Sequence, residues 1–418
     1  MRVLWFTNTP TPEMVRHAGQ GNEGYGGHWA AELARHVAEL SDMELGIATA
    51  YPGLHEAQFQ EGRVHYFVIP QPRRFPAFGM REIDLRRCII IIKEFKPDLI
   101  HIHGSERLYG MVKVSARTPI PTLVSLQGLL GSFSLARHFF GTLSPREILK
   151  SIRLLELPVR LGLVWQYLDA RRGARREAKI LATADGFLGR TEWDHAHSRA
   201  YNPKAPYFHV GEILRPVFYR NRWSLQGCDR YSLIYTNAGH PNRGTENLLA
   251  AAACLSSEFP NIRLRLAGRV SARSGYGRFI RDRIRKLGLS DRVELLGYID
   301  EGAMITELLR AHVFAITSYI ENSPNSLAEA MLVGMPCVAS FVGGIPTMVQ
   351  DENTGMLYPV DDIPLLVEKI RRIFRDDILA SRLGTNAYDV AHQRHDPETV
   401  VSELTAAYRA VLASLGKR

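Results

Sequence analysis

Short apolar runs rich in β-branched residues alternate with helix-like segments along the first half of the chain. Apolar residues between the first two runs recur at helical spacing, which predicts a helix from about Gly27 to Leu40. Strand, helix and strand in this order are typical of a parallel sheet wrapped by helices. The expected strands read "RVLWFTN", "MELGIATA", "VHYFVIP", "DLIHIHG", "PTLVSLQG", "GFLGRT" and "APYFHVG".

The alternation stops at "LRPVFYRNRWSLQGCDR" and begins again at "YSLIYTNAG", which predicts a second domain of the same kind. We therefore expect an α/β chain of two Rossmann-like, doubly wound domains, over 1–213 and 230–395, with a linker over 214–229. A terminal helix over 396–418, capped by Asp396, is expected to pack back on the first domain. Ligands of such sheets bind at the carboxyl ends of the strands, so the expected active site is a cleft that both domains face.

Composition narrows the class of protein. The 418 residues are 45% hydrophobic and 23% charged, which suits a soluble globular protein with two cores. Its four cysteines form no Cys-x-x-Cys pair, which argues against a zinc site and a disulfide framework. The amino terminus lacks the features of a signal peptide and no apolar run could span a membrane, so we expect a cytoplasmic protein. The net charge of +9 favours an anionic partner.

The stretch "TSYIENSPNSLAEAMLVGMPCVAS" carries the most informative chemistry. After a strand, Asn325 is expected to cap a helix that begins at about Ser326. Glu321 and Glu329 lie on either side of the amino terminus of that helix. The helix dipole and open backbone amides favour a phosphate there, and a carboxylate can accept hydrogen bonds from ribose hydroxyls.

Glu321 and Glu329, together with the following "AMLVGMPCVAS" and "VGGIP", closely resemble the C-terminal signature of retaining glycosyltransferase family 4, which has the GT-B fold. The resemblance covers most of the chain, most closely over 230–362, and continues through "GRTEWDHAH" and "HIHGS". It implies a retaining hexosyltransferase that uses a nucleotide-diphosphate sugar, in polysaccharide or glycolipid biosynthesis. The sequence contains no Asp-x-Asp motif, so neither a metal nor another cofactor is expected.

The resemblance also implies roles for individual residues. Glu321 would contact the transferred sugar near the reaction centre, Arg243 would hold the donor diphosphate, and we take both as catalytic. Glu329 would bind the donor ribose. His103 and Gln127 are candidate contacts to the sugar or to the acceptor, which we expect to be lipid-linked or a saccharide. The other donor-binding candidates are Gly26, Gly27, Gly239, His240, Arg269, Tyr298, Ser323, Pro324, Asn325, Ser326 and Leu327.

Three positions depart from the family pattern. In relatives an arginine usually follows the glycine that corresponds to Gly239, and His240 replaces it here. A histidine is only partly protonated at neutral pH. Gln127 replaces a histidine of many relatives; it can donate a hydrogen bond but cannot titrate. Thr347 stands where relatives often carry glutamate. Arg243 is therefore expected to be the main cation at the diphosphate.

The stretch "GQGNEGYGG" contains a literal Gly-x-Gly-x-x-Gly pattern that starts at Gly19. A dinucleotide fingerprint needs its first glycine at the strand-to-helix turn, whereas about eleven residues separate Thr7 from Gly19 here. The second strand also lacks the required acid. We interpret the match as accidental and assign only Gly26 and Gly27 to a loop that closes on the donor phosphate.

Two further features leave alternatives open. His101 and His103 share a strand face and could ligate a metal, but no third ligand is evident, which favours structural or substrate-contacting roles. The stretch 144–180 mixes apolar residues at helical spacing with arginine and lysine. It forms either helices with a solvated basic face or a surface for anionic lipid headgroups, which would place the protein peripherally at the inner membrane face.

Two rival functions also stay open. A sugar-nucleotide epimerase can have the same architecture, although that class is not expected to show the pattern around Glu321 and Glu329. A non-catalytic nucleic-acid-binding protein would explain the basic charge. The sequence has no recognisable nucleic-acid motif, so nucleic acid is not an expected partner.

Overall fold

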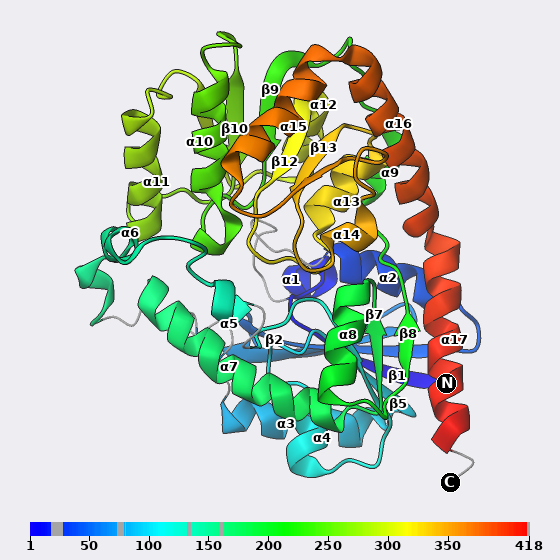
Figure 1. Cartoon of the computed structure of the whole chain (residues 1–418). Coiled ribbons are helices and arrows are strands. Elements are labelled where there is room, and N and C mark those ends of the chain that lie inside the picture. Colours follow the sequence, from blue (N-terminus) through cyan, green and yellow to red (C-terminus); the bar gives the residue numbers. More distant parts are fainter. Residues whose placement is uncertain (18–27, 73–78, 80, 132–134, 159–161, 416–418) are drawn as a thin grey trace. The chain divides into compact units, whose positions relative to one another are not determined.

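The fold is described from a computed structural model (Figure 1). The described residues are 1–17, 28–72, 79, 81–131, 135–158 and 162–415. Contacts between residues divide the chain into two compact units. Unit 1 comprises Met1–Ser132, Asp169–Arg215 and His395–Arg418, and unit 2 comprises Phe133–Leu168 and Pro216–Arg394.

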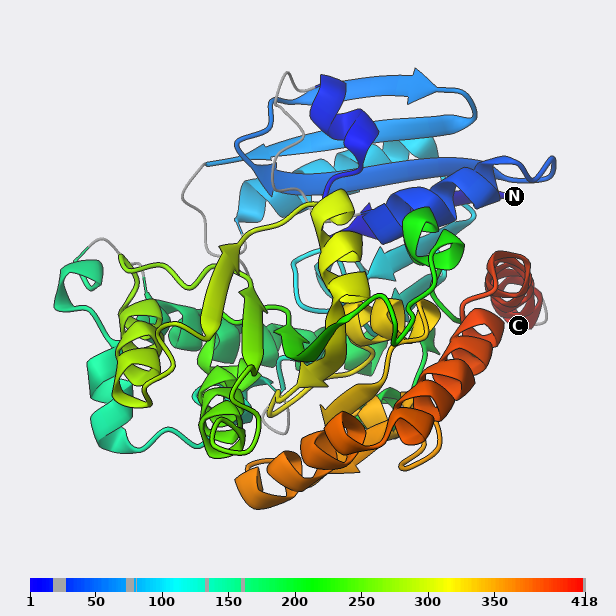
Figure 2. The ribbon, with the colours of Figure 1, turned by 90° about the horizontal axis from the view of Figure 1, so that it is seen from above.

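Unit 1 is built on an eight-stranded sheet in the order β3-β4-β2-β1-β5-β6-β7-β8. β3 pairs antiparallel with β4 at the edge of the sheet, and the other neighbours pair in parallel (Figure 2). The sequence prediction missed β3, since "AQFQE" is polar and half exposed, as an edge strand can be. The strands are β1 (Arg2–Thr7), β2 (Glu44–Pro52), β3 (Ala57–Glu61), β4 (Val64–Gln71), β5 (Leu99–His103), β6 (Thr122–Ser125), β7 (Gly186–Gly189) and β8 (Tyr207–His209).

Helices cover the sheet of unit 1. The terminal helix packs on this sheet. In the core, the hydroxyl of Tyr408 accepts a hydrogen bond from Nε1 of Trp5 in β1 at 2.9 Å. Asp396 caps that helix by accepting the backbone N–H of Thr399 at 2.8 Å. The helices are α1 (Pro12–His17), α2 (His28–Ala38), α3 (Glu82–Phe95), α4 (Met111–Ala116), α7 (Leu163–Thr183), which begins in unit 2, α8 (Glu192–Tyr201) and α17 (Pro397–Leu415).

Unit 2 is built on a six-stranded sheet in the order β11-β10-β9-β12-β13-β14, with parallel pairing throughout. Its central strands β12 and β13 are buried along their whole length and mostly apolar, as expected for a parallel sheet that is covered on both faces. The strands are β9 (Asp229–Tyr235), β10 (Arg263–Ala267), β11 (Val293–Gly297), β12 (Ala311–Ile316), β13 (Cys337–Ser340) and β14 (Met356–Tyr358). The helices are α5 (Leu135–His138), α6 (Pro145–Ser151), η1 (Leu154–Glu156), α9 (Pro216–Arg220), η2 (Pro241–Arg243), α10 (Thr245–Leu255), α11 (Gly275–Lys286), α12 (Glu301–Arg310), α13 (Asn325–Leu332), α14 (Ile345–Met348), α15 (Ile363–Arg375) and α16 (Asp377–Arg394).

The division into units differs from the predicted boundaries in two places. Segment 133–168, predicted to belong to the first domain, packs in unit 2, where the ring of Phe139 meets that of His240 at 4.6 Å. The predicted linker over 214–229 is packed as well: Trp223 is 6% exposed and its Nε1 donates to the carbonyl of Ala311 at 2.8 Å. Phe139 and Trp223 are both buried, and these contacts, distant in sequence, determine where the two segments pack.

No helix within the described residues combines the length and apolar character needed to cross a bilayer.

Candidate functional site

The candidate site of unit 2 lies where β9, β10, β12 and β13 end, which is the ligand-binding edge of a parallel sheet. The loops after these strands contact one another. A side chain at Gly239 would place its Cβ 2.7 Å from the carbonyl oxygen of Arg269, so only glycine allows that approach. Oγ1 of Thr317 donates to the carbonyl of Gly244 at 2.8 Å. These contacts bring residues from three loops to one place.

Arg243 and Glu321, the two predicted catalytic residues, form an ion pair through Nη1 and Oε1. The side chains are only 27% and 11% exposed. Glu321 also accepts the hydroxyl of Ser318 at 2.8 Å, and the Tyr235 hydroxyl fixes the carbonyl of Arg243 at 2.6 Å. Burial lowers the pKa of Arg243, but a guanidinium stays protonated at any physiological pH. The pair therefore presents a poorly hydrated cation that a carboxylate holds in place.

The amino terminus of α13 comes shortly after Glu321 in the chain. The prediction that Asn325 caps this helix is wrong: the N-cap is Pro324, whose side chain offers no hydrogen bond, and Asn325 is the first helical residue. The amide of Leu327 is occupied, because it donates to the carbonyl of Pro324 at 3.0 Å. The amides of Ser323 and Ser326 form no hydrogen bond with another described residue, so this end of the helix can still accept an anion.

The other donor-binding candidates of unit 2 differ in charge and exposure. Burial lowers the pKa of His240 to about 4, so its ring is neutral at pH 7 and adds no cation. Arg269 is exposed, and no described side chain pairs with its guanidinium. Glu329 is 5% exposed within α13, and Tyr298, directly after β11, is 56% exposed. Arg243 and Arg269 are thus two cations of these loops that could contact a phosphate.

His103 and Gln127 of unit 1 line one small cavity of about 20 Å³, which admits nothing larger than a water molecule. The cavity also contacts the buried ion pair of Arg190 and Glu212, whose atoms lie 2.8 Å apart. Sequence reasoning missed that pair, although each residue stands just after a strand, where ligand-binding side chains gather. Gly26 and Gly27 lie outside the described residues.

The rings of His101 and His103 are in contact, with centroids 3.7 Å apart and a tilt of 32° between their planes, which confirms that they share a face. Both ring nitrogens of His101 are hydrogen-bonded, to the hydroxyls of Tyr408 at 2.6 Å and Ser125 at 2.7 Å. Burial lowers its pKa to about 3, so the ring is neutral and structural. Burial also lowers the pKa of His103 well below its usual value, and its ring nitrogens form no hydrogen bond with any residue that the structure describes. Over the described ranges, no group of three His, Cys, Asp or Glu side chains is placed to hold a metal.

Sequence reasoning also missed a buried carboxylate in α7. Glu177 accepts the backbone N–H groups of Leu130 at 2.8 Å and Gly131 at 2.9 Å, and the hydroxyl of Ser105 at 2.6 Å. It is fully buried, and burial raises its pKa to about 8. Gln127 belongs to the same loop after β6, so this carboxylate holds the loop that carries a candidate contact.

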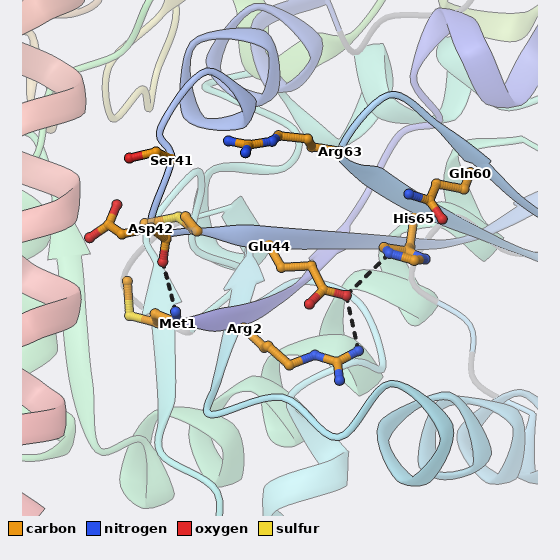
Figure 3. Close-up of a pocket in the computed structure, with 9 residues that line it drawn as sticks. Met1, Arg2, Ser41, Asp42, Glu44, Gln60, Arg63 and His65 are labelled. Carbon is orange, nitrogen blue, oxygen red and sulfur yellow. Dashed lines mark hydrogen bonds and ion pairs between the residues drawn. The ribbon is translucent and has the colours of Figure 1, made fainter.

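A larger cavity of about 410 Å³ lies at the opposite, amino-terminal edge of the unit 1 sheet (Figure 3). Several of its charges pair: Glu44 pairs with Arg2 at 3.1 Å and faces His65 at 3.2 Å, while Arg63 donates to the carbonyl of Leu40 at 3.1 Å. Asp42 pairs with Arg409 at 3.0 Å. Because it lies at the amino-terminal ends of the strands, this cavity is not part of the candidate site.

Residues 223–390, which make up most of unit 2, match the family model "Glycosyl transferases group 1". The chain is 31% identical over 227 residues to D-inositol 3-phosphate glycosyltransferase of Streptomyces avermitilis, which covers 50% of this chain and 49% of that protein. It spans between 33% and 58% of the lengths of the first curated relatives that it matches.

Solved structures show the same architecture. Sucrose-phosphate synthase from Thermosynechococcus elongatus superposes with a TM-score of 0.76 at 19% identity, over 99% of this chain and 100% of that one. HepE of Anabaena, solved in complex with UDP-glucose, superposes with a TM-score of 0.64 at 16% identity, over 98% and 100%. The two parallel-sheet α/β domains therefore have the GT-B fold.

Proposed function

We propose that this protein is a retaining glycosyltransferase that moves a hexosyl group from a nucleotide-diphosphate sugar to a hydroxyl, without a metal or other cofactor. The observation that supports this most directly is the ion pair of Arg243 and Glu321 beside the open amides of Ser323 and Ser326. A diphosphate needs a cation and N–H donors, and a sugar needs a carboxylate that accepts its hydroxyls. These groups lie together at the carboxyl edge of one sheet.

Donor binding would change the partner of Arg243. The diphosphate carries more charge than a carboxylate, so it would replace Glu321 at the guanidinium and receive further hydrogen bonds from the α13 amides. Glu321 would then be free to accept hydrogen bonds from the sugar hydroxyls, as the family resemblance implies. Because His240 is neutral, Arg243 carries the main positive charge that stabilises the departing diphosphate, with Arg269 as the second cation.

We place the acceptor among lipid-linked or saccharide molecules of cell-surface polysaccharide or glycolipid biosynthesis. The name of the Streptomyces avermitilis relative makes D-inositol 3-phosphate the first acceptor to test. The complex of HepE makes UDP-glucose the first donor to test.

A thermal-shift screen of nucleotide sugars, starting with UDP-glucose, identifies the donor. A ligand at one hundred times its Kd should stabilise the native state by about 2.7 kcal/mol. Arg243→Ala should abolish the shift and lower kcat/KM by about 10²–10³, as for loss of one charged donor at a developing negative charge. Arg243→Lys should recover part of both, because it keeps the charge but not the bidentate geometry.

The matched control is Arg382→Ala on α16, an exposed arginine away from these loops. Acceptor-dependent release of the nucleotide, an anomeric configuration retained in the product and activity in EDTA are the expected results. Interconversion of the sugar nucleotide without acceptor would identify an epimerase instead. Equal donor affinity in wild type and Arg243→Ala would show that the diphosphate binds elsewhere.

A further inference from the structure

The segment 145–156 of unit 2, formed by α6 and η1, packs beside α11 in both views (Figures 1 and 2). Nη1 of Arg153 donates to the carbonyl of Arg273 at 2.7 Å. Gly275, at the start of α11, leaves no room for a side chain because the carbonyl of Ser151 occupies that space. One side of the segment is therefore fixed on α11, and the side chains on its other side face solvent.

Three leucines of that segment are exposed rather than buried. Leu149 is 69% exposed, Leu154 is 73% exposed and Leu155 is 72% exposed. The other large hydrophobic side chains that are exposed in the described residues are spread over several elements, whereas these three fall within seven residues. Single exposed leucines need no explanation, but such a cluster marks a surface that binds a partner.

The charges around these leucines are mainly positive. Arg146 and Lys150 form no ion pair with a described residue. Glu147 is occupied, since it lies 3.6 Å from Arg283 of α11 and caps α6 through Ser144. The apolar side chains thus stand among unpaired cations, an arrangement that is typical of surfaces that contact anionic lipid headgroups.

We propose that this surface, the leucine face, docks on a membrane that carries anionic lipids. Leucines enter the boundary between headgroups and acyl chains, while the arginine and lysine heads reach the lipid phosphates. A protein partner fits less well, because lysine is depleted from protein interfaces. The leucine face comprises Arg146, Leu149, Lys150, Leu154 and Leu155.

The structure confines the exposed leucines to a shorter segment than the stretch 144–180 that the sequence suggested. Residues 169–180 of that stretch belong to unit 1, and 159–161 lie outside the described residues. Leu155 of this stretch belongs to η1 and faces solvent. The inference does not depend on the proposed glycosyl transfer, since vesicle binding is measured without any substrate.

The test is co-sedimentation of the full chain with vesicles of phosphatidylglycerol and phosphatidylcholine in equal parts, and with pure phosphatidylcholine. Binding should require phosphatidylglycerol and weaken when NaCl rises from about 0.1 M to about 1 M, which shortens the Debye length from about 10 Å to about 3 Å. Lys150→Gln should weaken binding roughly fivefold. The double variant Leu154→Glu/Leu155→Glu should weaken it by well over tenfold.

Ile378→Glu on α16 is the matched control, because Ile378 is 82% exposed and lies outside the leucine face. It should bind vesicles like the wild type, and thermal melts should show that every variant folds, since the changed side chains are exposed. Vesicle binding that does not depend on phosphatidylglycerol would overturn the proposal. So would an Ile378→Glu variant that loses as much vesicle affinity as Leu154→Glu/Leu155→Glu. A dimer that Leu154→Glu/Leu155→Glu converts to a monomer would show that the face binds a second copy of this chain.

Discussion

Glu177→Ala should destabilise unit 1 far more than Glu177→Gln. Alanine leaves the buried amides of Leu130 and Gly131 without an acceptor, at about 1–3 kcal/mol each, so the free energy of unfolding should fall by about 2–6 kcal/mol. Glutamine keeps a carbonyl oxygen for both amides and can donate its amide group to the hydroxyl of Ser105. At neutral pH the free energy of unfolding of Glu177→Gln should therefore fall by less than about 1 kcal/mol.

The same carboxyl group predicts a pH dependence. Burial raises the pKa of Glu177 to about 8 in the folded protein, against 4.5 for an ordinary glutamate. Between these values the folded wild type binds a proton that the unfolded chain lacks, so its free energy of unfolding falls as the pH rises. The slope is at most about 1.4 kcal/mol per pH unit. Glu177→Gln has no such proton and should gain stability relative to the wild type from about pH 5 to about pH 8.

Urea unfolding followed by circular dichroism measures the global effect, and hydrogen exchange of a peptide across 128–131 localises it to the loop. The local probe is needed because two units need not unfold together. Glu94→Ala and Glu94→Gln are the control pair, since Glu94 is an exposed glutamate of α3 and neither change should matter. Equal losses for Glu177→Ala and Glu177→Gln would refute the role of the hydrogen bonds. A difference between wild type and Glu177→Gln that is constant with pH would refute the raised pKa.

Three further changes probe backbone, core and cap. Gly343→Ala should lower Tm and weaken the donor-induced thermal shift, because the carbonyl of Glu321 occupies the position that its Cβ would take. Gly288 is the control, since it has a similar positive φ but open surroundings. Gly288→Ala should lower the free energy of unfolding by only about 1–2 kcal/mol. Tyr408→Phe should cost at least about 1–3 kcal/mol in urea unfolding, since it strands two buried ring nitrogens. Asp396→Ala should cost about 1 kcal/mol by loss of the α17 cap. An unchanged Tm in any of these three would contradict the contact concerned.

The sequence predicted most strands of both sheets, because parallel strands buried on two faces are continuous apolar runs that need no knowledge of their partners. It also predicted that Glu321 and Arg243 carry the chemistry, from their places after strands and from a family resemblance. The polar edge strand β3 has no such signal and was missed. Asn325 was misplaced as a cap because Pro324, a poor capping residue, occupies that position.

The sequence by itself thus determined the two α/β domains and the loops that carry the candidate chemistry, since both follow from local periodicity and from order along the chain. Only the tertiary structure decided which charges meet. It pairs Arg243 with Glu321, neutralises His240 by burial and attaches 133–168 to unit 2. It also leaves the leucines of η1 in solvent. Pairing and burial depend on residues distant in sequence, whose contacts no local pattern encodes.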